Sequence, residues 1–453
     1  MTAFTSTVIV ATLIGAASSA FAQQIQPPPR ASGQPRNERP LDLTRDRQEL
    51  SAEATLLGGY DDNLSPVTGL GPFAPRDSGY AGAGNGILRY FIGRARKSLE
   101  IDGRGFVNTY PDIGPVIGGG AVAIGEVPLS RRTTLNVSQG AQWLPFFTMN
   151  MFSPLRESLG VANPDSNPAN GLVRTANEVT GTRSLVLDSQ ASVRQEWNRS
   201  FSTDGGYSYN SQTYSQSIAF DSRSHGAHLG VERTVARGTS IRTSYRYVDA
   251  LFAEARGTEL PMKDHIIELG VQRERDVSRT RRVSLSVRGG AQHTDTLDAT
   301  QRTPLEYWTP TAFGSIQYDW ARTWTVAADY QHSASVLNVS IVPQTFINHT
   351  ATLRTGGYLN DRMEGSLVFG YANGHAGAEV NDTYDGYTGT AQLRVGLSDS
   401  WSSILAYNHH QYRLTRDASI FFDVPRQVHR NSLWLGLSWS APLIRRYMRT
   451  GSR

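Results

Sequence analysis

The sequence predicts an all-β protein, an antiparallel transmembrane β-barrel, on three observations. Segments between Ser51 and Trp439 alternate apolar and polar side chains, as strands do when their two faces meet different surroundings. Short polar turns recur at regular intervals with longer connections between them, which is typical of a barrel with tight turns at one rim. Beyond the first residues, no apolar run approaches the roughly 20 residues of a spanning helix, so membrane crossing must use strands.

The spacing of the short turns predicts the number of strands. The turns lie near residues 94, 130, 198, 236, 278, 322, 360 and 399, and successive differences are 36, 68, 38, 42, 44, 38 and 39. A unit of two strands, one turn and one loop takes about forty residues. Eight turns between nine loop-bearing hairpins give 18 antiparallel strands, with both termini on the turn side. Because the stretch 111–130 is rich in Gly, 16 strands is the alternative.

Individual segments show the alternation residue by residue. In the stretch 241–247, Ile, Thr and Tyr share one face and Arg and Ser share the other. In the stretch 387–397, Thr388, Thr390, Gln392 and Arg394 lie opposite a face of apolar and small residues. A period of two with one polar face fits an outer wall in lipid and an inner wall in water.

The single interval of 68 residues contains the stretch from Pro145 to Thr182, which shows no strand alternation. Its apolar cluster is too hydrophobic to lie in water unsupported. We expect this loop to fold into the mouth as a constriction, a lid or a sugar-contacting surface. The alternative is a loop packed on the rim or at a protomer interface. The candidate residues are Phe146, Phe147, Met149, Met151 and Phe152.

The composition excludes several kinds of chemistry. The chain has no Cys, which rules out disulfides, thiolate metal sites and thiol catalysis. Only Lys97 and Lys263 are lysines, so 42 of the 44 basic residues are arginines (44 − 2). Arginine binds phosphate and carboxylate well and lines pores, although codon bias in a GC-rich genome is the simpler explanation. No basic block or recognition motif is present, so no nucleic-acid partner is expected.

The N-terminal residues indicate export. An apolar core over 8–17 precedes Ala20-Phe21-Ala22, which predicts a signal peptide over 1–22, although the residues before the core lack Lys and Arg. Residues 23–50 are rich in Pro, Gln and Arg and predict a disordered periplasmic segment. The barrel is expected over 51–440, followed by a basic periplasmic tail over 441–453. We therefore expect a location in the outer membrane of a Gram-negative cell, with outer-membrane lipids and the barrel-assembly machinery as partners.

The alternation also predicts which charged side chains line the lumen. Basic and acidic residues are nearly balanced there, which suits neutral or mixed-charge solutes better than a strict ion filter. A weak anion preference and purely structural ion pairs are both compatible with this set. The candidate pore-lining residues are Arg104, Arg194, Arg242, Arg246, Arg288, Arg354, Arg394, Glu100, Asp102, Asp188, Glu268, Asp319 and Asp329.

Aromatic residues gather beside the short turns. Amphipathic rings prefer the level of the lipid head groups, so these residues predict a membrane girdle on the turn side. The alternative is a soluble sandwich or propeller with ordinary strand-end aromatics. The candidate girdle residues are Phe91, Trp197, Phe201, Trp320, Trp324, Tyr358, Trp401 and Trp439.

Metal binding and catalysis are not expected. The run Asp61-Asp62-Asn63 has oxygen-bearing side chains for a cation, but no calcium-loop spacing follows it, and a role in a turn is favoured. The close pairs His225/His228 and His409/His410 point to opposite faces of a strand and do not chelate readily. The chain has no G-x-S-x-G or H-E-x-x-H motif. We predict no enzyme activity, no metal and no cofactor.

Two short motifs carry a family resemblance. With the stretch 56–63 (Leu-Leu-Gly-Gly-Tyr-Asp-Asp-Asn) and the ending 435–443, the chain resembles the β-barrel porin-2 type of outer-membrane protein over roughly residues 50 to 443. The resemblance implies a link to production or export of surface polysaccharide. In contrast to ordinary porins, a basic tail with Arg445, Arg446, Arg449 and Arg453 follows the last strand, so Trp439 would serve as the aromatic anchor.

These observations predict an outer-membrane channel for hydrophilic solutes, either by general diffusion or in export of exopolysaccharide, and the family resemblance favours the export role. The lumen would conduct through water, with inward charges setting selectivity. A structural or adhesive barrel with no open pore, whose loops contact surface partners, is the alternative.

Overall fold

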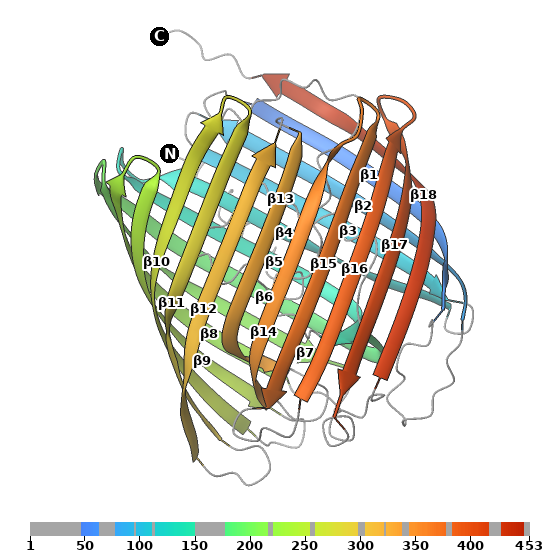
Figure 1. Ribbon diagram of the computed structural model, residues 1–453. Coiled ribbons are helices and arrows are strands. Elements are labelled where there is room, and N and C mark those ends of the chain that lie inside the picture. Colours follow the sequence, from blue (N-terminus) through green and yellow to red (C-terminus); the bar gives the residue numbers. More distant parts are fainter. Residues whose placement is uncertain are drawn as a thin grey trace, which may run out of the picture.

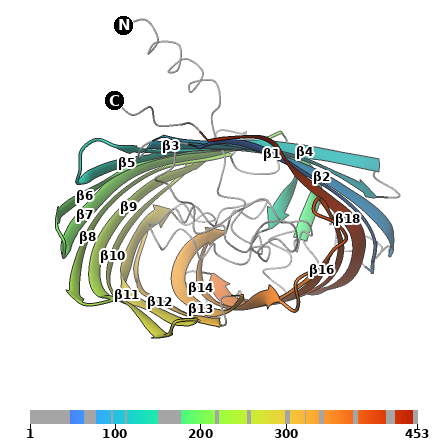
Figure 2. The same cartoon turned by 90° about the horizontal axis from the view of Figure 1, so that it is seen from above.

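In the residues that the structure describes, the chain forms eighteen antiparallel strands in one closed sheet (Figures 1 and 2). The computed structural model describes residues 47–62, 78–94, 97–110, 114–149, 177–215, 221–253, 259–297, 304–320, 323–337, 344–376, 383–415 and 427–447. Each strand pairs with its neighbours in sequence, and β1 pairs with both β2 and β18, which closes the barrel. The predicted 18-stranded antiparallel barrel is thus confirmed.

The strands are β1 (Arg47–Asp61), β2 (Gly79–Arg94), β3 (Lys97–Tyr110), β4 (Gly114–Pro128), β5 (Thr133–Met149), β6 (Asn177–Asn198), β7 (Phe201–Tyr214), β8 (Asp221–Ala236), β9 (Thr239–Ala253), β10 (Glu259–Ser278), β11 (Arg281–Leu297), β12 (Pro304–Trp320), β13 (Trp324–Leu337), β14 (Gln344–Tyr358), β15 (Met363–Ala376), β16 (Thr383–Gly396), β17 (Trp401–Leu414) and β18 (Gln427–Tyr447).

All eight predicted short turns lie between strands at one rim, which we call the short-turn rim. The bounds of the strands leave two to four residues in each of these turns. Between β8 and β9 the connection is Arg237-Gly238, and Gly238 adopts a φ of 69°, which a residue with a side chain rarely tolerates. Elsewhere polar side chains hold the turn: Asn198 Oδ1 accepts a hydrogen bond from the amide of Ser200 at 2.8 Å.

The connections at the opposite rim, the loop rim, are generally longer, and the longest joins β5 to β6. The strands beside it extend further than the alternation predicts, because β5 continues to Met149 and β6 begins at Asn177. The expectation of an irregular segment over all of Pro145 to Thr182 was therefore wrong at both ends. Ladder pairing between the two strands continues there without an alternating pattern. Of the candidate loop residues, Phe146, Phe147 and Met149 lie on β5 by their backbone, whereas Met151 and Phe152 lie outside the described residues.

The barrel also begins earlier and ends later than expected. β1 starts at Arg47, within the segment predicted to be disordered, and β18 runs to Tyr447, within the predicted tail. Arg47 pairs with Tyr447, so the two strands end together at the short-turn rim. The pairing passes an irregularity at Leu50/Ser51, where Leu443 is skipped. Residues 1–46 and 448–453, with the predicted signal peptide, Arg449 and Arg453, lie outside the described residues.

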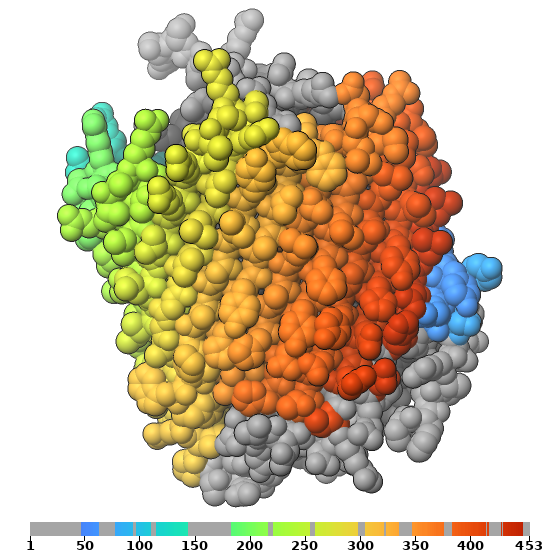
Figure 3. Space-filling view, viewed as in Figure 1, coloured from blue at the N-terminus to red at the C-terminus, as the bar shows by residue number. Residues whose placement is uncertain are grey.

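The outer face of the barrel is apolar. On β18, Leu433, Leu435 and Leu437 project outward and are 51%, 60% and 47% exposed. Their neighbours Ser432 and Ser438 point inward and are buried. The same alternation runs over β10 to β17, whose outer wall is seen in Figure 3. Among the described residues, no helix is long and apolar enough to cross a membrane.

The Gly-rich segment that suggested sixteen strands is β4. Its neighbours approach closely: a Cβ built on Gly120 would lie 2.4 Å from the carbonyl oxygen of Ala141 on β5. Glycine is needed there because no side chain fits between the two backbones. The weak alternation of this stretch therefore reflects close strand packing and not a missing hairpin.

The seam between the first and last strands is held by side chains as well as backbone. Arg430 on β18 donates to the carboxylate of Asp61 through Nε (3.1 Å to Oδ1) and Nη2 (2.7 Å to Oδ2), and Asp61 is fully buried. The next residue, Asp62, accepts from the amide of Asn431 at 2.6 Å and from its side chain at 2.7 Å. Asp61 and Asp62 thus join β1 to β18 near the loop rim.

Removing the carboxylate of Asp61 is expected to destabilise the seam. Asp61→Ala leaves the Arg430 guanidinium partly buried without this partner, which costs about 3 kcal/mol. The double variant Asp61→Leu/Arg430→Met removes both charges and should recover much of that loss. Denaturant unfolding in detergent micelles measures both, with Asp399→Ala in an exposed turn as the control. Equal stability of Asp61→Ala and the wild type would show that the ion pair does not hold the seam.

Candidate functional site: the inner wall of the barrel

The candidate site is the inner wall of the barrel, where polar and charged side chains from many strands face each other. The strand registers and the pattern of burial define which positions point inward. All thirteen charged residues predicted for the lumen share this inward face, together with buried residues such as Thr294 and Asn348. Whether they line a conducting pore stays a prediction.

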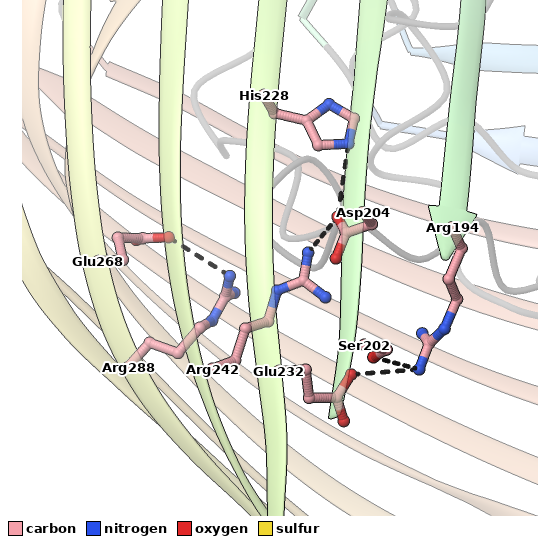
Figure 4. Close-up of polar contacts among 8 residues, drawn as sticks. All are labelled: Arg194, Ser202, Asp204, His228, Glu232, Arg242, Glu268 and Arg288. Atoms are coloured by element: carbon pink, nitrogen blue, oxygen red, sulfur yellow. Dashed lines mark hydrogen bonds and ion pairs between the residues drawn. The ribbon is translucent and has the colours of Figure 1, made fainter. Parts of the chain in front are cut away.

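Figure 4 shows one part of this wall, where side chains from β6 to β11 form ion pairs with one another. Asp204 on β7 lies at its centre. Its Oδ2 accepts from Nη2 of Arg242 at 2.7 Å and lies 3.7 Å from Nε2 of His228. Because Arg242 and His228 come from β9 and β8, one carboxylate connects three consecutive strands across the inner face.

Two more pairs flank Asp204. Nη2 of Arg194 on β6 lies 3.4 Å from Oε2 of Glu232 and 3.3 Å from Oγ of Ser202. On the other side, Nη1 of Arg288 lies 3.5 Å from Oε2 of Glu268. Both side chains of this second pair are largely buried, at 9% and 12% exposure. Positive and negative side chains thus alternate around the wall, and their electric fields largely cancel at longer range.

Arg288 makes a second contact that fixes its position. The guanidinium carbon lies 4.5 Å from the ring centroid of Phe313 on the neighbouring strand β12. A cation over an aromatic face is stabilised by the ring quadrupole. Arg288 is therefore held between Glu268 and Phe313.

The remaining wall repeats this arrangement with other strands. Asp329 on β13 accepts from Nη2 of Arg354 at 2.6 Å and from Oγ of Ser315 at 2.7 Å. Near the start of the chain, Nε of Arg89 lies 3.0 Å from Asp102 and 3.4 Å from Glu100. The wall thus carries both signs of charge on strands from β2 to β14.

Several partners of the predicted lumen residues were missed from the sequence. Asp204, Glu232 and His228 complete the pairs of Figure 4, and Arg89 completes the pair with Asp102. β7 has no apolar alternation over 201–206, so the inward face of Asp204 could not be identified from that strand alone. The register with β6, where Arg194 lies opposite Asp204, would have identified it.

The inner wall of β14 to β18 has a different chemistry, with aromatic rings beside amides. Tyr384 donates to Oδ1 of Asn348 at 2.8 Å, and Tyr412 lies on the next strand. Trp434 on β18 is packed in a cluster with Leu57 and Ile404. All of these side chains are buried, so they pack the wall and present little surface to the lumen.

The predicted aromatic girdle divides between the two faces of the sheet. Six of its residues project outward beside the short turns, and a role as a membrane belt stays a prediction for Trp197, Phe201, Trp320, Trp324, Trp401 and Trp439.

Phe91 and Tyr358 do not fit the girdle, because they share the inward face. Phe91 lies opposite Glu100, and the guanidinium carbon of Arg47 is 5.9 Å from the ring centroid of Phe91. Tyr358 lies opposite the buried Glu364. Since successive strand residues face opposite sides, an error of one position reverses the assignment.

Residues considered for a metal site have other partners. Asp61 and Asp62 are bound to Arg430 and Asn431 at the end of β1, and the predicted role of this run in a turn stays a prediction because Asn63 lies outside the described residues. The two close histidine pairs are split between the faces, with His228 and His410 inward and His225 and His409 outward. Within the described ranges, no three His, Cys, Asp or Glu side chains form a group that could hold a metal ion.

Comparison with known proteins adds to the description of the fold. No protein-family model matches the chain, and no curated protein matches it. Among solved structures, Pseudomonas aeruginosa OccK11 (OpdR) aligns with 13% identity over 88% of this chain and 96% of its own, with a TM-score of 0.43. Acinetobacter baumannii OccAB3 aligns with 10% identity over 88% and 100%, with a TM-score of 0.45. The unliganded ferric citrate transporter FecA aligns with 11% identity over 86% of this chain and 63% of its own, with a TM-score of 0.44.

Proposed function

We propose that the protein is an outer-membrane channel that passes hydrophilic solutes through the barrel lumen. The observation that carries this proposal is the division of one closed sheet into an apolar outer face and a charged inner face. An apolar exterior of this kind suits lipid. Eighteen strands enclose a wider lumen than an eight-stranded barrel, whose interior is filled by side chains.

The inner charges favour a pore for neutral or mixed-charge solutes. Basic residues such as Arg242, Arg288 and Arg354 each lie against a carboxylate from a strand one or two positions away. Paired charges keep the wall wet and polar without the strong single-sign field of an ion filter. These ion pairs also stabilise the wall, and the two roles are compatible.

For the solute, we propose a surface polysaccharide. Partly exposed guanidinium groups of the inner wall, such as those of Arg242 and Arg354, donate hydrogen bonds of the kind that sugar hydroxyls accept. The resemblance of the stretches 56–63 and 435–443 to the porin-2 type supports the same class of solute.

Conduction is the first property to test. The purified protein in a planar bilayer should give stable steps of ion current, and liposomes containing it should swell in sugars up to a size limit. Swelling rates for sugars of graded mass give the effective width of the pore. A barrel that gives neither current nor swelling would instead be a structural or adhesive protein without an open pore.

The wall charges should set a modest selectivity. In a water-filled lumen a unit charge about 10 Å from an ion acts with about 0.4 kcal/mol, or about twofold in permeability. We expect Glu268→Gln to favour anions and Arg288→Gln to favour cations, each by about twofold, in reversal potentials across a salt gradient. Arg233→Gln is the matched control, because Arg233 projects from the outer face. A shift in the control as large as in Arg288→Gln would show that the inner wall does not select.

The polysaccharide proposal predicts that oligosaccharides interrupt the ion current. Arg354→Ala should shorten the blocked intervals about fivefold by removing hydrogen-bond donors, and Arg354→Lys should retain part of the block. The outward Arg233→Ala serves as the control. Unchanged blocking in Arg354→Ala, with normal capsule or slime in a deletion strain, would leave general diffusion as the function.

A further inference from the structure

Eight of the ten histidines of the chain project from the outer face of the barrel. Each lies within a few residues of the loop-rim end of its strand, and none lies at the short-turn rim. The outward histidines are His225, His265, His293, His332, His349, His375, His409 and His429.

These histidines lie where the apolar outer wall ends. In one row across β9 to β12, Tyr247, His265, His293 and Trp308 are direct cross-strand neighbours. The next outward row towards the loop rim is charged and consists of Asp249, Lys263, Asp295 and Glu306.

The rows on the other side of the histidines are apolar. On β10, Ile267, Leu269 and Val271 follow His265 on the outer face, and the next outward residue is Arg273. Lys263 and Arg273 are ten positions apart, about 33 Å along a strand. At a typical barrel tilt this is a height of about 25 Å, the thickness of the apolar band of an outer-membrane barrel. The histidine row therefore marks the lipid head-group level on the loop side.

A repeated side-chain arrangement holds the histidines in place. In the β9–β10 hairpin, the ring of His265 packs on Tyr247, directly opposite, with centroids 5.0 Å apart. Nδ1 of the same imidazole lies 2.8 Å from the hydroxyl of Tyr245, two positions further into the apolar band. One Tyr-x-Tyr segment thus supplies both a packing ring and a hydrogen bond to the histidine of the next strand.

The same arrangement recurs in two other hairpins. In β7–β8, His225 packs on Tyr209 at 5.0 Å and its Nδ1 lies 2.5 Å from the hydroxyl of Tyr207. In β13–β14, His349 stacks on His332 at 4.3 Å and its Nδ1 lies 3.0 Å from the hydroxyl of Tyr330. We call these three histidines with their tyrosines the collar.

Two further hairpins keep the tyrosine and replace the histidine by another acceptor. Tyr371 on β15 donates to Oδ1 of Asp385 on β16 at 3.4 Å. Tyr407 on β17 donates to Oδ1 of Asn431 on β18 at 2.8 Å. The arrangement therefore surrounds much of the barrel, always with the tyrosine on an odd-numbered strand.

The hydrogen bond to tyrosine determines which ring nitrogen of each imidazole is free to donate. A phenol at the edge of an apolar band must donate its proton, because an unpaired hydroxyl there is costly. In the tautomer in which the phenol donates to Nδ1, the imidazole carries its ring proton on Nε2. Each collar histidine then offers an Nε2–H donor to groups outside the barrel.

We propose that the collar binds the sugar head groups of glycolipids in the leaflet on the loop side. Sugar hydroxyls accept from Nε2–H, donate to acids such as Asp249, Asp295 and Glu306 in the adjoining row, and stack on exposed rings such as Trp308, which is 69% exposed. Those three acids, with Lys263 as the cation of the same row, make a lone phosphate a poor partner.

The short-turn rim has the opposite chemistry, which sharpens the assignment. Exposed arginines occupy its turns, and Arg273 and Arg275 project from the outer face just above them. Arginine is the side chain that best matches phosphate. One rim therefore suits phospholipid head groups and the other suits sugars. The turn arginines are Arg131, Arg132, Arg199, Arg237, Arg279 and Arg362.

This inference rests on the membrane location in the proposed function but not on conduction. Its test uses the purified full chain in detergent micelles, with two uncharged probes of equal acyl chains: a diacyl lipid with a disaccharide head group, and diacylglycerol, which carries no phosphate for the arginines of the short-turn rim. Native mass spectrometry of competing mixtures counts the bound lipids. The wild type should prefer the glycolipid about tenfold, the size that one or two net hydrogen bonds supply. Equal binding of the two lipids would overturn the proposal without any variant.

Variants then identify the groups responsible. His225→Phe/His265→Phe/His349→Phe keeps the rings and removes the donors, and most of the preference should disappear. The corresponding Gln variant keeps an N–H donor and should restore part of it. Tyr318→Phe, an outward tyrosine near the short-turn rim, is the matched control. A Phe triple variant that migrates as a folded barrel and retains the full preference would overturn the role of the histidines.

Conduction measured on the same samples separates the two proposals. Loss of the glycolipid preference with normal current would contradict the collar proposal and leave the channel proposal intact. A barrel that prefers glycolipid but carries no current would support the collar proposal and contradict the channel proposal.

Discussion

Closure of the sheet is the constraint on which the rest of this structure depends. Backbone N–H and C=O groups cannot stay unpaired in hydrocarbon, and eighteen strands satisfy them only because β1 pairs with β18 as well as with β2. Closure also separates two environments, because alternate residues must face opposite sides of a continuous wall. Every assignment of a side chain to lipid or lumen follows from that separation, including the ion pairs of the inner wall and the aromatic rows outside.

Much of this fold could be predicted from the sequence, because turn spacing and alternation are local signals. The eight short turns and the strand number needed only the positions of polar turn residues. The pairing of charges was not local: Asp204 and Arg242 are 38 residues apart, and only the register brings them together. Phe91 and Tyr358 show the limit of alternation, since a shift of one residue reverses the face. The ends of β5 and β6 were missed because strand pairing there continues without an amphipathic pattern.

The chemistry of the wall changes with height as well as with face. Arginines occupy the short turns, apolar side chains fill the middle of the outer wall, and histidines with tyrosines lie at its loop-side edge. Inside, carboxylate and guanidinium groups are paired between strands one or two apart, so the wall is polar with little net charge. Each hairpin thus contributes to the apolar outer wall, to its histidine-bearing edge and to the charged inner wall. The two-residue period of a strand separates the outer surfaces from the inner one.

The ion pair between Asp61 and Arg430 joins residues that are 369 positions apart. Both residues are present only once the whole intervening chain has been synthesised. Until then, β1 and β18 each present an edge with unpaired backbone groups, which can pair with any other strand. The protein therefore depends on protection of these two edges during assembly. Pairing of the last strand, β18, with β1 therefore decides whether the sheet closes into a barrel or stays open with two edges that are prone to aggregation.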